Sequence, residues 1–391
     1  MPISDIFPDA GIKFWDVAHE TNGGLIADGY TRATGKMSMV IAQNGPGVTG
    51  LVTPIKTAYW NHTPLLLVTP QAANKTMGQG GFQEVEQMNL FKDMVCYQEE
   101  VRDPSRMAEV LNRVIEKAIR GSAPAQINVP RDYWTQVIDI ELPPIVRFER
   151  QGGGKDAIQR AAKMLSDAKF PVILSGAGVV IGDAINECKA LAEKLDAPVC
   201  NGYQHNDSFP GSHPLAVGPL GYNGSKAAMQ LISKADVVLA LGTRLNPFST
   251  LPGYGIDYWP KNANIIQVDM NPDRIGLTKK VTVGIAGDAK QVAKQIFDKL
   301  SSNAGDSGRE DRKNLIHQTK SAWLQTLTSL DHEDDDPGTV WNKEARERDK
   351  DRMSPRQAWR AIQAAMPEDA IISSDIGNNC AIGNAYPTFE K

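Results

Sequence analysis

The sequence predicts an α/β protein built from consecutive doubly wound parallel sheets. Short apolar segments of strand length alternate with amphipathic segments of helix length along most of the chain, which is typical of βα units. A glycine triplet at 152–154 has the character of an interdomain linker. Hydrophobic residues make up 41% of the 391 residues, so the chain can bury cores for roughly two to three domains.

The first predicted domain covers residues 1–147. Its clearest helix is expected at 105–120, where apolar residues recur with helical spacing. Ser105 is the expected N-cap of this helix and Gly121 its expected end. Strands of this domain are expected at 12–18, 37–43, 64–70, 95–101 and 125–130.

A second doubly wound domain is predicted at 148–305. Its expected strands lie near 172–175, 198–201, 237–241, 265–269 and 281–285, and its expected helices near 156–168, 183–195 and 288–300.

The remainder of the chain is predicted to form no complete domain. Residues 306–353 are highly charged, with an acidic run at 331–338, and are expected to be a solvated linker. Residues 354–391 are expected to hold one helix at 355–366 and one strand at 370–374. One helix and one strand cannot bury a core, so this third domain is expected to be incomplete.

Composition excludes several classes of protein. The formal net charge is −4, which predicts no nucleic-acid partner and no anionic membrane surface. The four cysteines are far apart in the sequence, so a zinc site or disulfide framework is not expected. The first residues lack the pattern of a secretory signal, and no apolar run is long enough to cross a bilayer. We therefore expect a cytoplasmic protein.

The residues with the clearest chemical character lie in the segment 17–49. Glu20 follows an expected strand and begins a glycine-rich helix, and Gly45, Pro46 and Gly47 form a tight strand-to-helix turn. By spacing alone, Glu20 is either a first-turn glutamate that interacts with the helix dipole or a catalytic carboxyl group. Likewise, the turn is either an ordinary corner or a place where missing side chains let backbone approach a ligand.

This segment resembles the pyrimidine-binding domain of thiamine-diphosphate enzymes, the superfamily of pyruvate decarboxylase and acetolactate synthase. The resemblance rests on His19-Glu20, the stretch 27–35 and Gly45-Pro46-Gly47. Further segments at 58–64, 70–84, 331–338 and 375–379 resemble the sulfoacetaldehyde acetyltransferase subfamily.

The resemblance implies a cofactor, thiamine diphosphate, and roles for several residues. Glu20 would hydrogen-bond the aminopyrimidine ring and so activate the cofactor, a role that suits a carboxyl group in a partly dry cleft. Gly45, Pro46 and Gly47 would let backbone approach that ring. Gln83 would face the thiazolium ring and the substrate, with a surface-loop glutamine as the alternative.

Four further residues are candidates for substrate contacts. His19 and His62 could contact substrate or move a proton, although a histidine beside a buried strand is more often simply hydrogen-bonded into place. Asn61 and Lys75 could hold an anionic sulfonate or phosphate. An ordinary solvent-exposed lysine is the alternative for Lys75.

The implied reaction converts sulfoacetaldehyde and inorganic phosphate to acetyl phosphate and sulfite, as in taurine and sulfonate catabolism. The resemblance further implies a homodimer or homotetramer with active sites between subunits. A decarboxylating carboligase like acetolactate synthase is the alternative enzyme. A non-catalytic dimerising fragment is the alternative from a different class.

The metal-binding half of the expected cofactor site is not found in the sequence. Enzymes of this superfamily anchor the diphosphate through Mg²⁺ with a Gly-Asp-Gly motif and a later asparagine, which are hard oxygen ligands. The nearest match, Gly287-Asp288-Ala289, lies in the second domain. We therefore expect no metal ligands in this chain, truncation at both ends with the first strand and helix of domain one missing, and little activity of the fragment alone.

A partial dinucleotide fingerprint occurs in the second domain. Gly176, Gly178 and Gly182 follow a predicted strand, but the spacing has one residue too many for the G-x-G-x-x-G pattern. Asp269 ends another strand, where a ribose-binding acid could lie. We interpret this domain as a vestigial nucleotide fold and expect no FAD.

Overall fold

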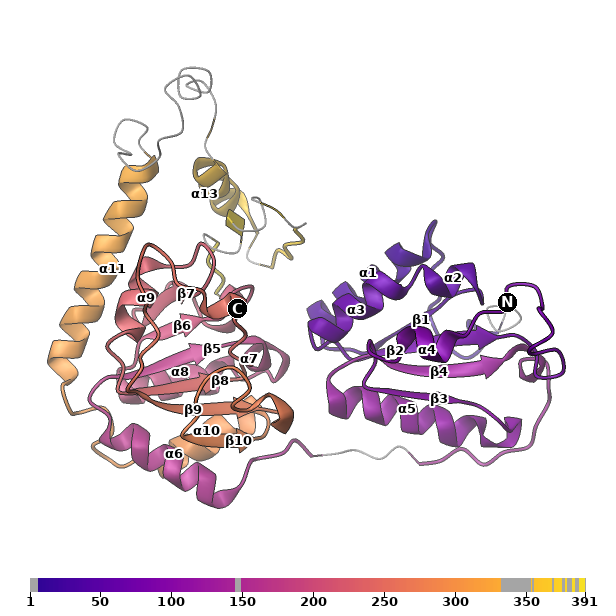
Figure 1. The fold of residues 1–391 in the computed structure, drawn as a ribbon. Coiled ribbons are helices and arrows are strands. Elements are labelled where there is room, and N and C mark those ends of the chain that lie inside the picture. The colour runs from indigo at the N-terminus through magenta and orange to yellow at the C-terminus, as the bar shows by residue number, and fades with distance from the viewer. Residues whose placement is uncertain are drawn as a thin grey trace. The chain divides into compact units, whose positions relative to one another are not determined.

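In a computed structural model, the chain divides into two compact units, Met1–Phe148 and Glu149–Lys391. The structure describes residues 6–144, 149–331, 353, 355–367, 369–374, 377, 382–383 and 387–390. The boundary predicted from the sequence lies one residue earlier, after residue 147. Both units are parallel α/β sheets (Figure 1), and the predicted fold class is confirmed.

The first unit is a four-stranded parallel sheet in the order β1-β2-β4-β3. Helices cover both of its faces, with α1 and α3 on one side and α5 on the other (Figure 1). Each face has its own apolar core. Leu51 and Ile55 belong to the core under α1 and α3, and Val110 and Val114 belong to the core under α5. The elements are α1 (Glu20–Thr34), β1 (Ser38–Ile41), α2 (Pro46–Thr49), α3 (Val52–Trp60), β2 (Leu65–Gln71), α4 (Gln87–Phe91), β3 (Tyr97–Glu100), α5 (Met107–Gly121) and β4 (Ala125–Pro130).

One predicted strand of this unit is wrong. Residues 12–18 form no strand, and Ile12, Phe14, Trp15 and Val17 are exposed, with Trp15 at 79%. The apolar run has the composition of a strand, but a strand needs a neighbouring backbone with which to pair, and the structure gives these residues none. The other four predicted strands are present within two residues at each end.

The ends of the predicted helix 105–120 also differ from expectation. A short 3₁₀ turn at Pro104–Arg106 precedes α5, and its N-cap is Asp103, whose carboxylate accepts from the Ser105 amide at 2.9 Å. At the other end, Gly121 is the last helical residue and Ser122 is the left-handed C-cap.

The second unit is a six-stranded parallel sheet in the order β10-β9-β8-β5-β6-β7. Its strand order reverses between β5 and β8, so these two strands border the topological switch point. The elements of this unit are α6 (Lys155–Asp167), β5 (Pro171–Ser175), α7 (Ala177–Ile181), α8 (Ile185–Leu195), β6 (Val199–Asn201), β7 (Ala216–Pro219), α9 (Lys226–Ile232), β8 (Val237–Leu241), β9 (Asn264–Asp269), β10 (Val283–Ala286) and α10 (Ala289–Lys299). Of these, β7, α7 and α9 were not predicted from the sequence.

The charged segment that follows is partly helical, where the sequence analysis expected a linker. Helix α11 (Arg309–Asp331) packs against α9, and the Tyr254 and Trp323 rings meet at 5.6 Å between centroids. Most of the acidic run, residues 332–338, lies outside the described residues.

The last described segments hold helix α13 (Pro355–Ala365), in agreement with the helix predicted at 355–366. The strand predicted at 370–374 is wrong, because those residues have no regular structure. Most of the segment 375–379 lies outside the described residues. No helix in the described part of the chain is long and apolar enough to cross a membrane.

Candidate active site

Most of the residues predicted to carry chemistry gather at the carboxyl edge of the first unit's sheet. Strand β1 ends at this edge and continues into the corner 42–47, and β2 continues into the loop 72–86. Helix α1 also begins here with Glu20, since it runs back toward the start of β1. The carboxyl edge is where open parallel sheets bind ligands.

Glu20 lies directly against the Gly45-Pro46-Gly47 turn. A Cβ atom added to Gly47 would come within 3.2 Å of Glu20 Oε1, and one added to Gly50 within 3.4 Å of Glu20 Cβ. Thr21 Oγ1 donates to the Gly50 carbonyl at 2.7 Å and joins the first turn of α1 to the corner. Any side chain at position 47 would therefore crowd the Glu20 carboxyl group.

Gln83 meets the same turn from the loop 72–86. Its backbone has a φ of +60°, which is uncommon for a residue other than glycine. A Cβ atom on Gly45 would lie 2.7 Å from the Gln83 carbonyl oxygen, so only glycine allows this approach. Glu20 and Gln83 thus contact residues of the turn that are two positions apart.

Lys75 and His19 lie at the same edge. Lys75 is exposed in the loop 72–86, whose shape is held by Glu84, because the Glu84 carboxylate accepts from the Gly78 amide at 2.6 Å and the Gly81 amide at 3.0 Å. His19 is the N-cap of α1, and its Nδ1 atom accepts from the Thr21 amide at 3.2 Å. In this structure His19 therefore acts as a helix cap.

Asn61 and His62 lie elsewhere on the unit. Asn61 is the C-cap of α3, and His62 follows it with a φ of +61° in the connection to the start of β2. They therefore lie at the amino edge of the sheet, at the other end of α3 from the corner that Glu20 contacts, and a helix of 9 residues is about 13 Å long. The structure does not bring Asn61 and His62 together with Glu20 in this unit.

Asn44, at the same corner, is not among the residues predicted from the sequence. Asn44 is 3% exposed, and its Nδ2 atom donates to the Gln83 carbonyl at 3.1 Å. Its position between a strand and a glycine turn was the available signal, because a polar side chain there is expected to bind nearby backbone.

Asp288, in the nearest match to the metal motif, has contacts of its own in the second unit. It is the N-cap of α10 and accepts from the Gln291 amide at 3.1 Å, and it pairs with Arg150 at 3.3 Å. Across the described ranges, no group of three or more His, Cys, Asp and Glu side chains is placed to hold a metal ion.

The glycines of the partial dinucleotide fingerprint lie between the carboxyl ends of β5 and β8. The Gly178 amide donates to the Gly242 carbonyl at 2.8 Å, and a Cβ atom on Gly178 would lie 2.7 Å from Gly242 Cα. Asp269 Oδ1 accepts from the Asn271 amide at 2.9 Å, and burial raises the pKa of this carboxyl group. Gly176 and Gly178 thus allow the loops after β5 and β8 to pack closely, whereas Gly182 lies against Asp288.

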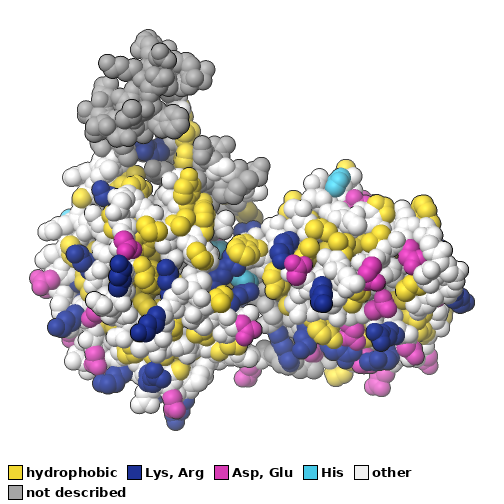
Figure 2. Space-filling model, in the orientation of Figure 1, with side chains coloured by type: hydrophobic (Ala, Val, Ile, Leu, Met, Phe, Trp, Pro, Cys, Tyr) yellow, Lys and Arg dark blue, Asp and Glu magenta, His cyan; other side chains and the backbone are white. Residues whose placement is uncertain are grey.

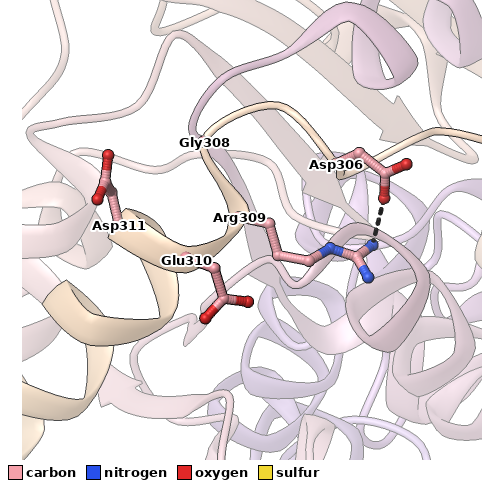
Figure 3. Close-up of a pocket in the computed structure, with 5 residues that line it drawn as sticks. All are labelled: Asp306, Gly308, Arg309, Glu310 and Asp311. Carbon is pink, nitrogen blue, oxygen red and sulfur yellow. Dashed lines mark ion pairs between the residues drawn. The ribbon is translucent and has the colours of Figure 1, made fainter.

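A pocket of the second unit lies at the start of α11 and is lined by Asp306, Gly308, Arg309, Glu310 and Asp311 (Figure 3). Arg309 pairs with Asp306 at 3.2 Å and with Asp196 at 2.8 Å. None of the predicted site residues lines this pocket.

Comparison with known proteins identifies the family. Residues 1–90 match the N-terminal TPP-binding domain of thiamine pyrophosphate enzymes, and residues 158–296 match the central domain of the same enzymes. The chain therefore belongs to the thiamine pyrophosphate (thiamine diphosphate) enzymes.

Individual relatives are similar along the whole chain. It is 78% identical over 391 residues to a protein of Rhizobium meliloti (strain 1021) named "Probable sulfoacetaldehyde acetyltransferase", covering 66% of that protein. It is 77% identical to the sulfoacetaldehyde acetyltransferase of Roseovarius nubinhibens, covering 65% of it. The chain thus spans about two thirds of the length of these curated relatives.

More distant relatives carry other names. The chain is 34% identical over 338 residues to a probable acetolactate synthase large subunit of Methanocaldococcus jannaschii, which corresponds to 84% of this chain and 55% of that protein. The solved structure of benzoylformate decarboxylase from Polynucleobacter necessarius has a TM-score of 0.64 at 23% identity, over 74% of this chain and 54% of that one. This last similarity supports the fold.

Proposed function

We propose that the chain contributes to a sulfoacetaldehyde acetyltransferase, which converts sulfoacetaldehyde and inorganic phosphate to acetyl phosphate and sulfite in taurine and sulfonate breakdown. The observation that supports this most directly is the placement of Glu20 against Gly47 at the carboxyl edge of a parallel sheet. The names of the relatives at 78% and 77% identity support the choice of substrate. The acetolactate synthase alternative has support only from relatives at much lower identity.

The residues of the first unit fit the pyrimidine ring of thiamine diphosphate. Gly45 and Gly47 are buried without side chains, so backbone is what a ring would meet there. The half-buried Glu20 carboxyl group would hold or move a proton at the ring nitrogen, a role typical of a positioned general acid–base group. When bound, the cofactor supplies the nucleophilic carbon for the reaction. Gln83 would then donate or accept a hydrogen bond toward the substrate.

The remaining candidate residues divide by position. Lys75 and His19 lie at the same edge as Glu20, so Lys75 would contribute positive charge toward an anionic sulfonate or phosphate. Asn61 and His62 lie at the opposite edge and have no place in a site built around Glu20 of the same unit.

In this proposal each domain has a different role. Residues 1–147 bind the pyrimidine half of the cofactor, residues 148–305 form the central domain, and residues 354–391 belong to a diphosphate-binding domain. Mg²⁺ and the diphosphate would be held by ligands outside the described residues, because Asp288 is engaged as a helix cap.

We propose that the enzyme is a homodimer or homotetramer with active sites between subunits. Large apolar side chains are exposed close to Glu20 in the chain and at the same edge, including Trp15 at 79% and Phe82 at 85%. Hydrophobic side chains also gather over α1 on the visible face of this unit (Figure 2). Exposed apolar patches of this kind mark interaction sites.

The free thiols Cys96, Cys188 and Cys200 favour a reducing, cytoplasmic location.

Replacing Glu20 with glutamine tests the proposal in an enzyme of the length of the curated relatives, of which this chain covers 66% and 65%. Glu20→Gln keeps the shape of the side chain and removes its acid–base chemistry, so sulfite release should fall by roughly 10²–10⁴-fold while thiamine diphosphate still binds. Sulfite and acetyl phosphate are measured together, and CO₂ is measured with pyruvate as substrate.

The matched control is Glu310→Gln, since the Glu310 side chain is 80% exposed in the second unit. This variant should release sulfite at the rate of the unmutated enzyme. Near-normal turnover of Glu20→Gln would contradict the role of Glu20, and CO₂ release from pyruvate without sulfite formation from sulfoacetaldehyde would favour the carboligase.

A further inference from the structure

Asn44 is a buried polar side chain that the proposed function leaves without a role. Its Nδ2 atom donates to the Gln83 carbonyl at 3.1 Å, and its Oδ1 atom accepts from Gln43 Nε2 at 2.7 Å. The bond to Gln83 joins segments 39 residues apart in the chain. Buried amides of this kind are costly unless they are hydrogen-bonded, and here the bond goes to the backbone of a candidate functional residue.

The Gln83 backbone needs such support. Its φ of +60° is one that residues other than glycine hold only when their surroundings impose it. The preceding residue, Phe82, is 85% exposed and packs little against the unit. The contacts that fix Gln83 come from the corner after β1, where its carbonyl meets Asn44 and Gly45, and its Oε1 lies 3.4 Å from Gln43 Nε2.

We propose that Asn44 is a positioning residue that holds Gln83 at the edge where Glu20 lies. This inference rests on the proposed function, in which Gln83 faces the cofactor and substrate. Glu20 lies against Gly47 and Gln83 against Gly45, so a single corner sets the spacing between the two groups. Loss of the Asn44 amide should release Gln83 while Glu20, which is joined to this corner through Thr21 and Gly50, keeps its place.

The chemistry of the bond suggests a sharp pair of variants. Asn44→Asp keeps the size of the side chain but removes the Nδ2 donor, so a carboxylate oxygen would face the Gln83 carbonyl with no proton between them. Asn44→Ala removes the side chain altogether. If Asn44 only fills space, Asn44→Asp should be mild and Asn44→Ala severe. If it holds Gln83, both variants should release the loop.

The first measurement is amide hydrogen exchange over residues 78–86 in the 391-residue chain. Both variants should speed exchange in this segment by roughly 10-fold or more, since a buried hydrogen bond is lost. The control is Asn112→Ala, because the Asn112 amide bonds to Glu116 within α5, away from the loop. Unchanged exchange in both Asn44 variants, or a change in Asn44→Ala alone, would overturn the inference.

The second measurement is turnover, with thiamine diphosphate and Mg²⁺, in an enzyme of the length of the curated relatives. Asn44→Asp should lower sulfite release by roughly 10- to 100-fold, and the double variant with Gln83→Ala should be no slower than Gln83→Ala alone, because both changes act on one contact. The rate of deuterium exchange at the thiazolium C2 atom reports on Glu20. In Asn44→Asp this rate should stay within about 2-fold of that of the unmutated enzyme. Two results would overturn the positioning role: a C2 exchange rate as low in Asn44→Asp as in Glu20→Gln, or losses of turnover from Asn44→Asp and Gln83→Ala that add in the double variant.

The two proposals fail in different ways. If the unmutated enzyme releases no sulfite from sulfoacetaldehyde, the proposed function fails whatever the Asn44 variants do. If it does release sulfite and Asn44→Asp loosens the loop without slowing turnover, the positioning role fails and the proposed function stands.

Discussion

Gly35 and Gly45 both have a positive φ but differ in their surroundings. Gly35, the C-cap of α1, has a φ of +68° and no atom within 4 Å of an added Cβ. Gly45 has a φ of +74° and a ψ of −117°, and an added Cβ would lie 2.7 Å from the Gln83 carbonyl oxygen. Gly35 is required by the left-handed backbone at the end of α1, and Gly45 is required by the close approach of Gln83 to the turn.

Alanine substitution at each glycine distinguishes these two structural requirements. Gly35→Ala should lower the free energy of unfolding by about 1 kcal/mol, the cost of a left-handed alanine. Gly45→Ala should cost about 1–3 kcal/mol more, because its Cβ must displace the Gln83 backbone. Urea titrations of both variants measure the difference, and equal losses would show that the approach of Gln83 to Gly45 is loose.

At the scale of elements, a buried arginine at the start of α11 joins this helix to the second unit, in addition to the packing of α11 against α9. Arg312 is 1% exposed, and its guanidinium donates to backbone carbonyl oxygens at 2.6–2.9 Å. Two acceptors belong to the end of α8, where partial negative charge favours a cation. The acceptors are the carbonyls of Lys169, Leu195, Asp196, Gly305 and Ser307.

Replacing this arginine should destabilise the second unit. Arg312→Met keeps much of the volume but leaves buried carbonyls without donors, so we expect a loss of about 2–5 kcal/mol in the free energy of unfolding. Arg309→Met is the control, because Arg309 is one-third exposed and its ion pairs should contribute less than about 1 kcal/mol. Thermal unfolding of both variants measures which one loses more stability. A larger loss in Arg309→Met than in Arg312→Met would refute the anchoring role of Arg312.

At the scale of the whole molecule, the chain holds separate apolar cores. The second unit contains one large core around its six-stranded sheet, and the first contains two smaller cores on the faces of its four-stranded sheet. Units with their own cores can unfold as separate cooperative transitions.

We therefore expect two transitions in a denaturant titration of the 391-residue chain. Arg312→Met should shift only the transition of the second unit, and Gly45→Ala only that of the first. Fluorescence and circular dichroism recorded together, with both variants, assign each transition. A single transition that both variants shift equally would show that the units unfold together.

The candidate site was identified mainly through its resemblance to a known family. Glu20, Gly45, Gly47 and Gln83 lie in sequence segments that resemble those of thiamine-diphosphate enzymes, and the structure places them at one edge of one sheet. Asn44 was missed because nothing local shows that its amide meets a loop 39 residues away. The opposite placement of Asn61 and His62 likewise depends on the direction in which α3 runs.

The sequence by itself determined the parallel α/β class, since strand and helix periods are local properties of the side chains. Only the tertiary structure decided which apolar segments become strands and which charged segments become helices. Residues 12–18 are apolar but have no strand beside them, and α11 is charged but is held by carbonyl oxygens distant in sequence. Hydrogen bonds between distant backbones require the assembled fold, which is why composition predicted these two segments wrongly.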